Sequence, residues 1–263
     1  MSGIDGASEN EGAEPPLSAP SAAPVAGQPS KSKTARSPAG ALGAALGWAF
    51  VALFYGSILW ALAYRFLPPP ATFTMVERKL SGEDVHHPWT PLSGISPHLV
   101  RAAIAAEDSR FCMHKGLDYE AIDEALGDNK SGKKRRGAST ISQQTAKNAF
   151  LWNGGGWVRK GAEAWFTLVI ETTWPKRRIM EVYLNIAEWG DGHFGAEAAA
   201  RARFGKSAAD LTKQEAALLA AVLPSPNKWR VDPPGPYVQR RAGMLRKRMD
   251  VVRSERLDAC VLK

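Results

Sequence analysis

The longest apolar stretch of the chain runs from Ala41 to Tyr64 and contains no charged residue. A helix needs about 20 apolar residues to cross a bilayer, and this stretch is long enough. A cleaved signal peptide would have an apolar region of only about 7 to 15 residues close to the start of the chain. The pattern therefore predicts a transmembrane helix over residues 41–64 rather than a signal peptide.

The flanks of this stretch predict its orientation. Lys31, Lys33 and Arg36 precede it, whereas only Arg65 follows it closely before Pro68. The positive-inside rule places the N-terminus in the cytoplasm and the chain from about residue 71 on the other side. Residues 1–40 are rich in Pro, Ala, Ser, Gly and Glu and lack large apolar side chains, so we expect a disordered cytoplasmic tail.

Beyond residue 71 the apolar positions recur at helical spacing, as in Ile179, Val182, Tyr183 and Ile186. This periodicity predicts a mainly helical domain over residues 71–255. The expected helices span residues 97–109, 118–126, 140–150, 157–173, 176–187, 195–203, 212–222 and 237–251.

Several helix starts carry their own signals. Ser96 before Pro97 offers an N-cap with proline in the first turn, and Asp118 could cap another helix. Thr140 with Gln143, and Thr212 with Glu215, have the spacing of a capping box.

Composition limits the class of partner. With 263 residues, 44% hydrophobic and 23% charged, the chain fits one globular domain plus accessory segments. The net charge of +8 suits an anionic partner, and charge alone does not separate nucleic acid from phosphate-bearing lipid or an acidic polymer. The transmembrane helix favours a lipid partner, so we expect no nucleic acid.

Cys112 and Cys260 are the only cysteines, and neither belongs to a CxxC motif. We therefore expect free thiols, although this pair could bridge in an oxidising compartment. The basic, Gly-containing segment 127–137 is expected to be a mobile loop. It is either a solvated linker or a flap that meets lipid phosphates.

The first chemical cluster is formed by Glu107 and Asp108, which end an apolar helix. Acids at a helix C-terminus face the negative end of its dipole, which favours a functional explanation. A carboxylate shielded by Ala and Phe has a raised pKa and can accept a proton near neutrality. A pair of surface acids in ordinary salt bridges is the alternative. His114 has no second His or suitably spaced acid, so packing is preferred over metal ligation.

The second cluster covers Gly137–Asn148. On a helix that begins near Thr140, Gln143 lies four residues before Lys147 and Gln144 four before Asn148, so amides and an ammonium share one face. Near a helix N-terminus such a face can hold an oxygen-rich anion such as a sugar diphosphate. A solvated helix face is the alternative.

The third cluster is Arg159, Lys160 and Glu163, where Arg159 and Glu163 can pair along one helix face. An exposed pair of little energetic value is the alternative. The block from Trp174 to Gly195 is interpreted as core and scaffold.

Together these motifs resemble the peptidoglycan glycosyltransferase family, glycosyltransferase family 51. The matching segments are E-D-x-x-F-x-x-H-x-G at Glu107–Gly116, G-x-S-T-x-x-Q-Q-x-x-K-N at Gly137–Asn148, R-K-x-x-E at Arg159–Glu163 and Y-L-N at Tyr183–Asn185. They occur in the family's order between about Thr90 and Lys228. Details such as Trp174-Pro175-Lys176 and Glu188-Trp189-Gly190 are similar to the monofunctional branch. The S-x-x-K matches at Ser30, Ser131 and Ser225 lie in a tail, a linker and a turn, and are interpreted as chance.

The resemblance implies a lysozyme-like helical fold and lipid II as substrate. It implies that Glu107 takes a proton from the 4-hydroxyl of the incoming sugar while the growing chain leaves its polyprenyl diphosphate with inversion. Glu163 would be the second catalytic residue, orienting cations, binding sugar or holding a divalent cation, Mg²⁺ or Mn²⁺, which is implied for only some members. The substrate-binding residues it implies are Asp108, His114, Ser139, Thr140, Gln143, Gln144, Lys147, Asn148, Arg159 and Lys160.

The same resemblance implies a single-pass protein of the cell inner membrane with a periplasmic catalytic domain, working with other cell-wall synthesis proteins and contributing to cell shape. Two other readings fit part of the pattern. A lysozyme-like lytic enzyme could share the fold and the acid, but it has no need of a cationic diphosphate pocket. A non-catalytic membrane tether would explain the charge and the apolar helix but not the ordered motifs.

Overall fold

The structure is a computed structural model that describes residues 38–120, 123 and 139–262. In these ranges the chain is helical, and its only β-type pairings are isolated bridges. This confirms the mainly helical fold class. The predicted tail up to residue 37 and the basic segment 127–137 lie outside the described residues.

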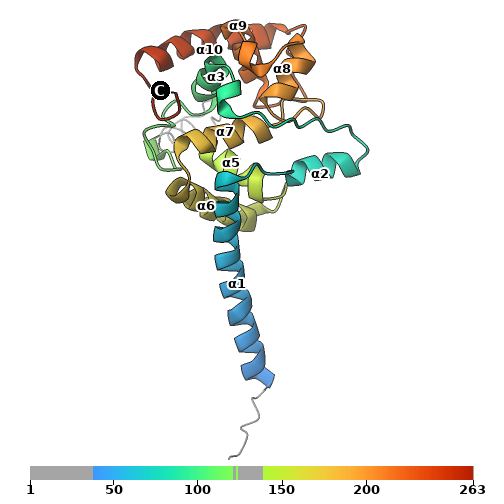
Figure 1. The fold of residues 1–263 in the computed structure, drawn as a ribbon, viewed down its shortest axis with the longest axis vertical. Helices are drawn as coiled ribbons and strands as arrows, with labels where there is room; N and C mark the ends of the chain where they lie inside the picture. Colours follow the sequence, from blue (N-terminus) through green and yellow to red (C-terminus); the bar gives the residue numbers. More distant parts are fainter. Residues whose placement is uncertain (1–37, 121–122, 124–138, 263) are drawn as a thin grey trace, which may run out of the picture. The chain divides into compact units, whose positions relative to one another are not determined.

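The apolar stretch forms one helix, α1, from Pro38 to Phe66 (Figure 1). Within the described residues α1 is the helix that is long and apolar enough to cross a membrane, with a mean hydropathy of 1.8. It begins three residues before the predicted start, so Pro38–Gly40 belong to the helix and not to the tail.

The predicted helices of the domain are found with small shifts at their ends. They are α3 (Pro97–Glu107), α5 (Ile141–Phe150), α6 (Gly156–Thr173), α7 (Lys176–Ile186), α8 (Ala196–Phe204), α9 (Lys213–Val222) and α10 (Pro236–Ser254). The helix α2 (Phe73–Leu80) and the 3₁₀ turns η1 (Leu92–Gly94) and η2 (Ala208–Asp210) were not predicted. The helix expected at 118–126 lies largely outside the described residues.

Three predicted caps are confirmed, whereas the helix that Asp118 was expected to cap lies largely outside the described residues. The Ser96 hydroxyl accepts from the His98 N–H at 3.3 Å, with Pro97 in the first turn of α3. Thr140 and Gln143 exchange hydrogen bonds of 3.1 and 3.0 Å at the start of α5. The Thr212–Glu215 pair does the same at α9. These helix starts are therefore set by local hydrogen bonds that satisfy free N–H groups.

Two helix groups build the domain. α3 packs against α9 and α10, whereas α5 packs against α6 and α7. α7 lies in the core, and its Ile179, Val182 and Leu184 have no exposed surface. Asn185 of α7 is also fully buried, but it bonds in both directions to the backbone of Thr90 at 2.8 Å. The asparagine of the Y-L-N motif is therefore structural.

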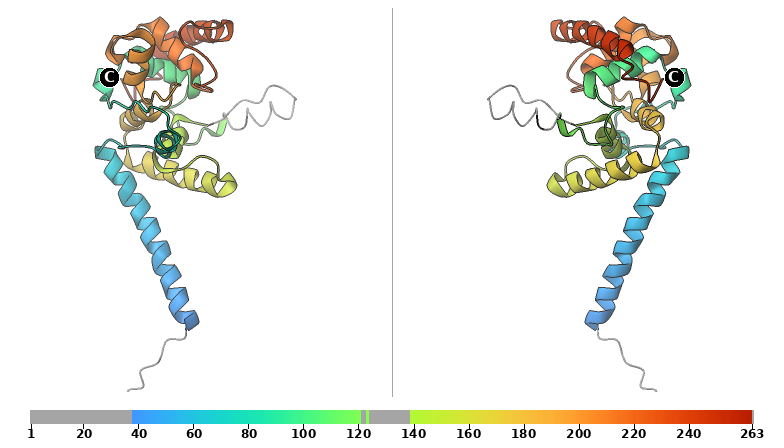
Figure 2. Two further views of the ribbon diagram at one scale, coloured as in Figure 1. Left: turned by 90° about the vertical axis from the view of Figure 1, so that its right-hand side faces the viewer. Right: turned by 90° about the vertical axis from the view of Figure 1, so that its left-hand side faces the viewer.

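The last turns of α1 pack against α6. The Trp165 Nε1–H donates to the Ser57 hydroxyl at 3.0 Å, and the Trp174 Nε1–H donates to the Ala61 carbonyl at 2.8 Å. Both views of Figure 2 show α6 crossing near the C-terminal end of α1. Indole N–H groups that are shielded from water usually donate a hydrogen bond to an oxygen. These two bonds therefore fix α6 to the last turns of the apolar helix.

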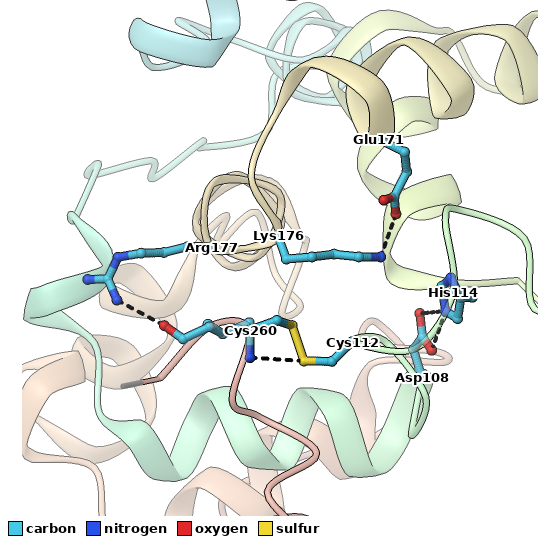
Figure 3. The surroundings of a disulfide bond; sticks show 8 residues. Asp108, Cys112, His114, Glu171, Lys176, Arg177 and Cys260 are labelled. Carbon is cyan, nitrogen blue, oxygen red and sulfur yellow. Dashed lines mark hydrogen bonds and ion pairs between the residues drawn. A yellow bond between two sulfur atoms is a disulfide. The ribbon is translucent and has the colours of Figure 1, made fainter.

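A disulfide joins Cys112, in the loop after α3, to Cys260, which follows α10 (Figure 3). The expectation of free thiols is therefore wrong. The cysteines are 148 residues apart, and their Cα atoms lie 5.6 Å apart because the segment after α10 returns to α3 and α7. There Arg101 pairs with Asp258 at 2.7 Å, and Arg177 donates to the Val261 carbonyl at 2.9 Å. The spacing of two cysteines in the sequence does not show whether the folded chain brings them within bonding distance.

We predict that Cys112→Ser with Cys260→Ser destabilises the domain by about 2 to 4 kcal/mol, because a cross-link over a long loop restricts the unfolded chain. For a domain of this size the melting temperature should fall by roughly 5 to 15 °C. Thermal unfolding of the full chain in detergent measures this. A reductant should lower the melting temperature of the wild type and leave the double variant unchanged. Equal melting temperatures for the two proteins would contradict the prediction.

Candidate active site

Three helices surround the carboxylate of Glu107, the last residue of α3. Gln144 of α5 donates its amide N–H to Oε2 at 2.9 Å, and the Arg241 guanidinium of α10 lies 4.0 Å from Oε1. The Glu107 side chain keeps 14% of its surface exposed. The carboxylate is therefore shielded from bulk solvent and still reachable by a ligand.

This environment raises the pKa of Glu107 above its ordinary value. Burial is the main cause, because it disfavours the charged form, and the negative charge of Asp108 adds to it. The hydrogen bond from Gln144 and the charge of Arg241 act in the opposite direction. The raised pKa expected from the sequence is confirmed, and it suits a group that accepts a proton near neutrality.

Asp108 connects α3 to α5. Its carboxylate lies 2.9 and 3.1 Å from His114 Nε2, and its Oδ2 accepts from the backbone N–H of Ile141 at 3.0 Å (Figure 3 shows the contact with His114). Ile141 is the first residue of α5. The acid that ends α3 therefore lies at the positive end of the α5 dipole, which offsets its unfavourable place on α3.

His114 uses both ring nitrogens. Nε2 faces Asp108, while Nδ1 accepts from the Gly116 N–H at 3.2 Å. The Gly116 carbonyl in turn accepts from the Thr140 hydroxyl at 2.6 Å. His114 and Thr140 thus hold the loop after α3 against the start of α5.

Two groups of side chains in this region are candidates for holding a divalent cation. Ligand atoms of Asp108, His114 and Asp118 lie within 4.8 Å of one another, a grouping that the sequence did not predict. However, Arg110 donates to both Asp118 oxygens, and the nitrogens of His114 are already bonded. This cluster is a hydrogen-bonded network and does not fit a metal ion.

Glu163 does not fit a metal ion either. Arg159 Nη1 lies 2.6 Å from one of its oxygens, and Lys160 Nζ contacts the other. The predicted Arg159–Glu163 pair is confirmed, but it is not an exposed one, because Glu163 is only 4% exposed. A divalent cation here would have to displace two bound cationic groups.

Lys147 lies beside this cluster. Burial lowers the pKa of Lys147, the charge of Glu163 raises it, and the charges of Arg159 and Lys160 lower it. Within the described parts of the chain its ammonium has no hydrogen bond or ion pair. Lys147, Arg159 and Lys160 carry three positive charges against one carboxylate, so the group has an excess charge suited to a diphosphate.

A cavity of about 180 Å³ lies along α5, and the predicted residues Gln144, Lys147 and Asn148 line it. Its other walls come from α2, α7 and the loops after α5, α7 and α9: Thr72, Thr74, Asn153, Tyr183, Ile186, Ala187, Glu188, Phe194, Leu223 and Pro226. A larger groove of about 700 Å³ beside α8 contains no predicted site residue.

The remaining predicted residues lie at the start of α5. Gln143 is buried and its side-chain oxygen is held in the capping box, so it supports the helix rather than lining the cavity. Thr140 is likewise buried, whereas Ser139 before it is exposed. The second cluster therefore divides into residues that shape α5 and residues that face the cavity.

Three residues of the site were not predicted. Arg241 lies on a helix rich in basic residues, and no motif distinguishes it from its neighbours. Tyr183 was assigned to the core by its periodicity. Glu188, assigned to the scaffold, lines the cavity and accepts from Arg78 at 3.0 Å and from Asn227 at 2.9 Å. The sequence had one signal for two of them, since Tyr183 and Glu188 belong to blocks of the family resemblance.

The chain is similar to a known protein family over most of its length. A family model described as Transglycosylase matches residues 74–252. A biosynthetic peptidoglycan transglycosylase of Rhodospirillum centenum is 58% identical over 203 residues, covering 77% of this chain and 88% of the relative. Proteins of the same description from Caulobacter vibrioides and Pseudomonas entomophila are 54% and 55% identical, covering 81% and 74% of this chain and 93% and 85% of the relatives.

The family model covers more than half of the chain, and the relatives align over most of their own length. The chain therefore belongs to the transglycosylase family, which confirms the resemblance to peptidoglycan glycosyltransferases that its motifs indicate.

Proposed function

We propose that this peptidoglycan glycosyltransferase polymerises lipid II into glycan strands, with Glu107 as the general base. The observation that carries the proposal is the placement of a shielded carboxylate next to a cationic cluster. Gln144 of α5 bonds to Glu107, and Lys147 lies almost one turn further along the same helix. Glu107 and Lys147 are thus joined through one rigid element.

In the proposed reaction Glu107 takes the proton of the 4-hydroxyl of the incoming lipid II. The oxygen attacks the anomeric carbon of the growing chain and forms the new glycosidic bond with inversion. The bond from that carbon to the polyprenyl diphosphate breaks, and its electron pair leaves with the diphosphate. Lys147, Arg159 and Lys160 stabilise the charge that develops there, while Glu163 holds Arg159 and Lys160 in place.

The surface of α6 supports a substrate carried in the bilayer. Trp157, Val158 and Leu168 are 91%, 79% and 55% exposed, and the same helix packs against the end of α1. Exposed apolar side chains next to a membrane-spanning helix are favourable at the membrane surface. The cationic residues Arg159 and Lys160 lie on this same helix, which supports contact with a lipid-borne diphosphate.

We propose that the domain faces the periplasm and that α1 crosses the cell inner membrane with the N-terminus in the cytoplasm. Lys31, Lys33 and Arg36 before the helix support this orientation. The disulfide supports it independently, because disulfides persist in oxidising compartments and are rare in the cytosol. Cooperation with other cell-wall synthesis proteins and a contribution to cell shape belong to the same proposal.

Glu107→Gln tests the reaction. The substitution keeps the shape of the side chain and removes the base, so polymerisation of purified lipid II should fall by at least about a hundredfold. The melting temperature should stay close to that of the wild type. Glu255→Gln, at an exposed acid after α10, is the matched control and should be fully active.

Near-normal turnover by Glu107→Gln would remove Glu107 from the role of base. Release of sugars from finished glycan by the wild type, without polymer formation from lipid II, would instead support the lytic reading.

Gln144→Leu tests how the base is tuned. The hydrogen bond from Gln144 stabilises ionised Glu107, so its loss should raise the pKa of Glu107 further. The base must be ionised to act, and the acid limb of kcat/KM against pH should therefore move to higher pH. The experiment compares the midpoint of that limb between variant and wild type, because the midpoint reports a pKa and does not depend on the plateau rate. A midpoint that stays in place or moves to lower pH would show that the limb does not report Glu107.

Thiol labelling in intact cells tests the orientation. With the domain in the periplasm, Cys112 and Cys260 should resist a membrane-permeant alkylating reagent until a reductant is added. Cys112→Ser is the control, because it leaves Cys260 free to react. Labelling of the wild type without reductant would place the domain in a reducing compartment.

A further inference from the structure

Tyr183 has a buried hydroxyl group that the fold leaves without a partner. Its side chain is 1% exposed, and within the described residues no group makes a hydrogen bond to the hydroxyl oxygen. Asn185, two residues further along α7, has all its bonds made. An unpaired buried hydroxyl destabilises a fold. We therefore expect its hydrogen-bond partner to be a molecule that is not part of the folded chain.

The position of Tyr183 in the wall of a cavity indicates where such a partner binds. Tyr183 lines the cavity of about 180 Å³ together with Gln144, Lys147 and Asn148. Gln144 contacts the base directly, because its amide N–H donates to Glu107 at 2.9 Å. The cavity therefore extends from the cationic group on one side to the vicinity of the base, and Tyr183 contributes to its wall from α7.

We propose that the Tyr183 hydroxyl is a substrate-binding group that donates a hydrogen bond to a sugar oxygen of the lipid-linked substrate, beside the oxygen that Glu107 deprotonates. This inference rests on the proposed function and assigns a further contact to the same site. Sugars present many hydroxyl, ring and acetamido oxygens that accept such a bond. The bound substrate thus satisfies a group that the free protein leaves unpaired.

The protonation state of Tyr183 fits a donor and excludes a base. Burial raises the pKa of the Tyr183 phenol well above its ordinary value, and the charges of Glu107 and Asp108 raise it further. The phenol is therefore protonated near neutral pH. Its contribution should be independent of pH, in contrast to that of Glu107.

Tyr183→Phe tests the proposal because it removes the hydroxyl and keeps the buried ring. We expect kcat/KM for lipid II polymerisation by the full chain in detergent to fall roughly tenfold, the effect of one lost hydrogen bond. The melting temperature without substrate should be unchanged or higher, since an unpaired buried polar group has been removed. The acid limb of the pH profile should stay in place.

A binding measurement separates this proposal from the proposed function. In the Glu107→Gln background, which blocks turnover, lipid II should raise the melting temperature less when Tyr183→Phe is also present. Tyr237→Phe is the matched control: this tyrosine is 41% exposed and packs its ring against Trp229, so both readouts should be unchanged. If the wild type fails to polymerise lipid II, the proposed function is wrong. The binding comparison would still test whether the Tyr183 hydroxyl contacts lipid II.

Three results would overturn the proposal. Unchanged kcat/KM together with unchanged lipid II binding would show that the hydroxyl does not contact substrate. Lower activity with a lower melting temperature would show a structural role, such as a bond to buried water. A shifted acid limb would show that Tyr183 acts through Glu107 and not on the substrate.

Discussion

The site depends on the burial of one carboxylate, Asp108. A charge placed in the interior must be met by donors, and here they are His114 and the first backbone N–H of α5. To supply that N–H, the end of α3 and the start of α5 must meet. Glu107 precedes Asp108, and Gln144 and Lys147 follow within the next turns of α5. The separation of Glu107 from Lys147 is therefore fixed by a contact between Asp108 and Ile141, in which neither takes part.

Burial shifts the pKa values of the acid and of the lysine in opposite directions. It raises the pKa of Glu107 and lowers the pKa of Lys147, so both groups move toward neutrality from opposite directions. Glu163 prevents this from going further at Lys147, because its charge favours the ammonium form. The site thus combines a carboxylate and an ammonium whose pKa values burial shifts toward each other.

The sequence predicted the features that depend on neighbours along the chain. Helical periodicity, the Thr140 and Thr212 capping boxes and the apolar helix follow local rules, and the structure reproduces them. The family motifs indicated Glu107, Gln144 and Lys147, and the capping-box spacing indicated the cap in which Gln143 takes part. Arg241, the hydroxyl of Tyr183 and the cysteine pair could not be predicted, because each depends on which distant helix packs beside it.

The cysteine pair also couples two distant segments of the domain. Cys112 lies in the loop after α3, close to Glu107, whereas Cys260 follows every described helix. The bond between them adds a covalent link to a loop that His114 and Thr140 otherwise hold by hydrogen bonds. Arg101 and Asp258 pair across the same two parts of the chain at 2.7 Å. Loosening of the segment after α10 is therefore transmitted to the loop beside Glu107.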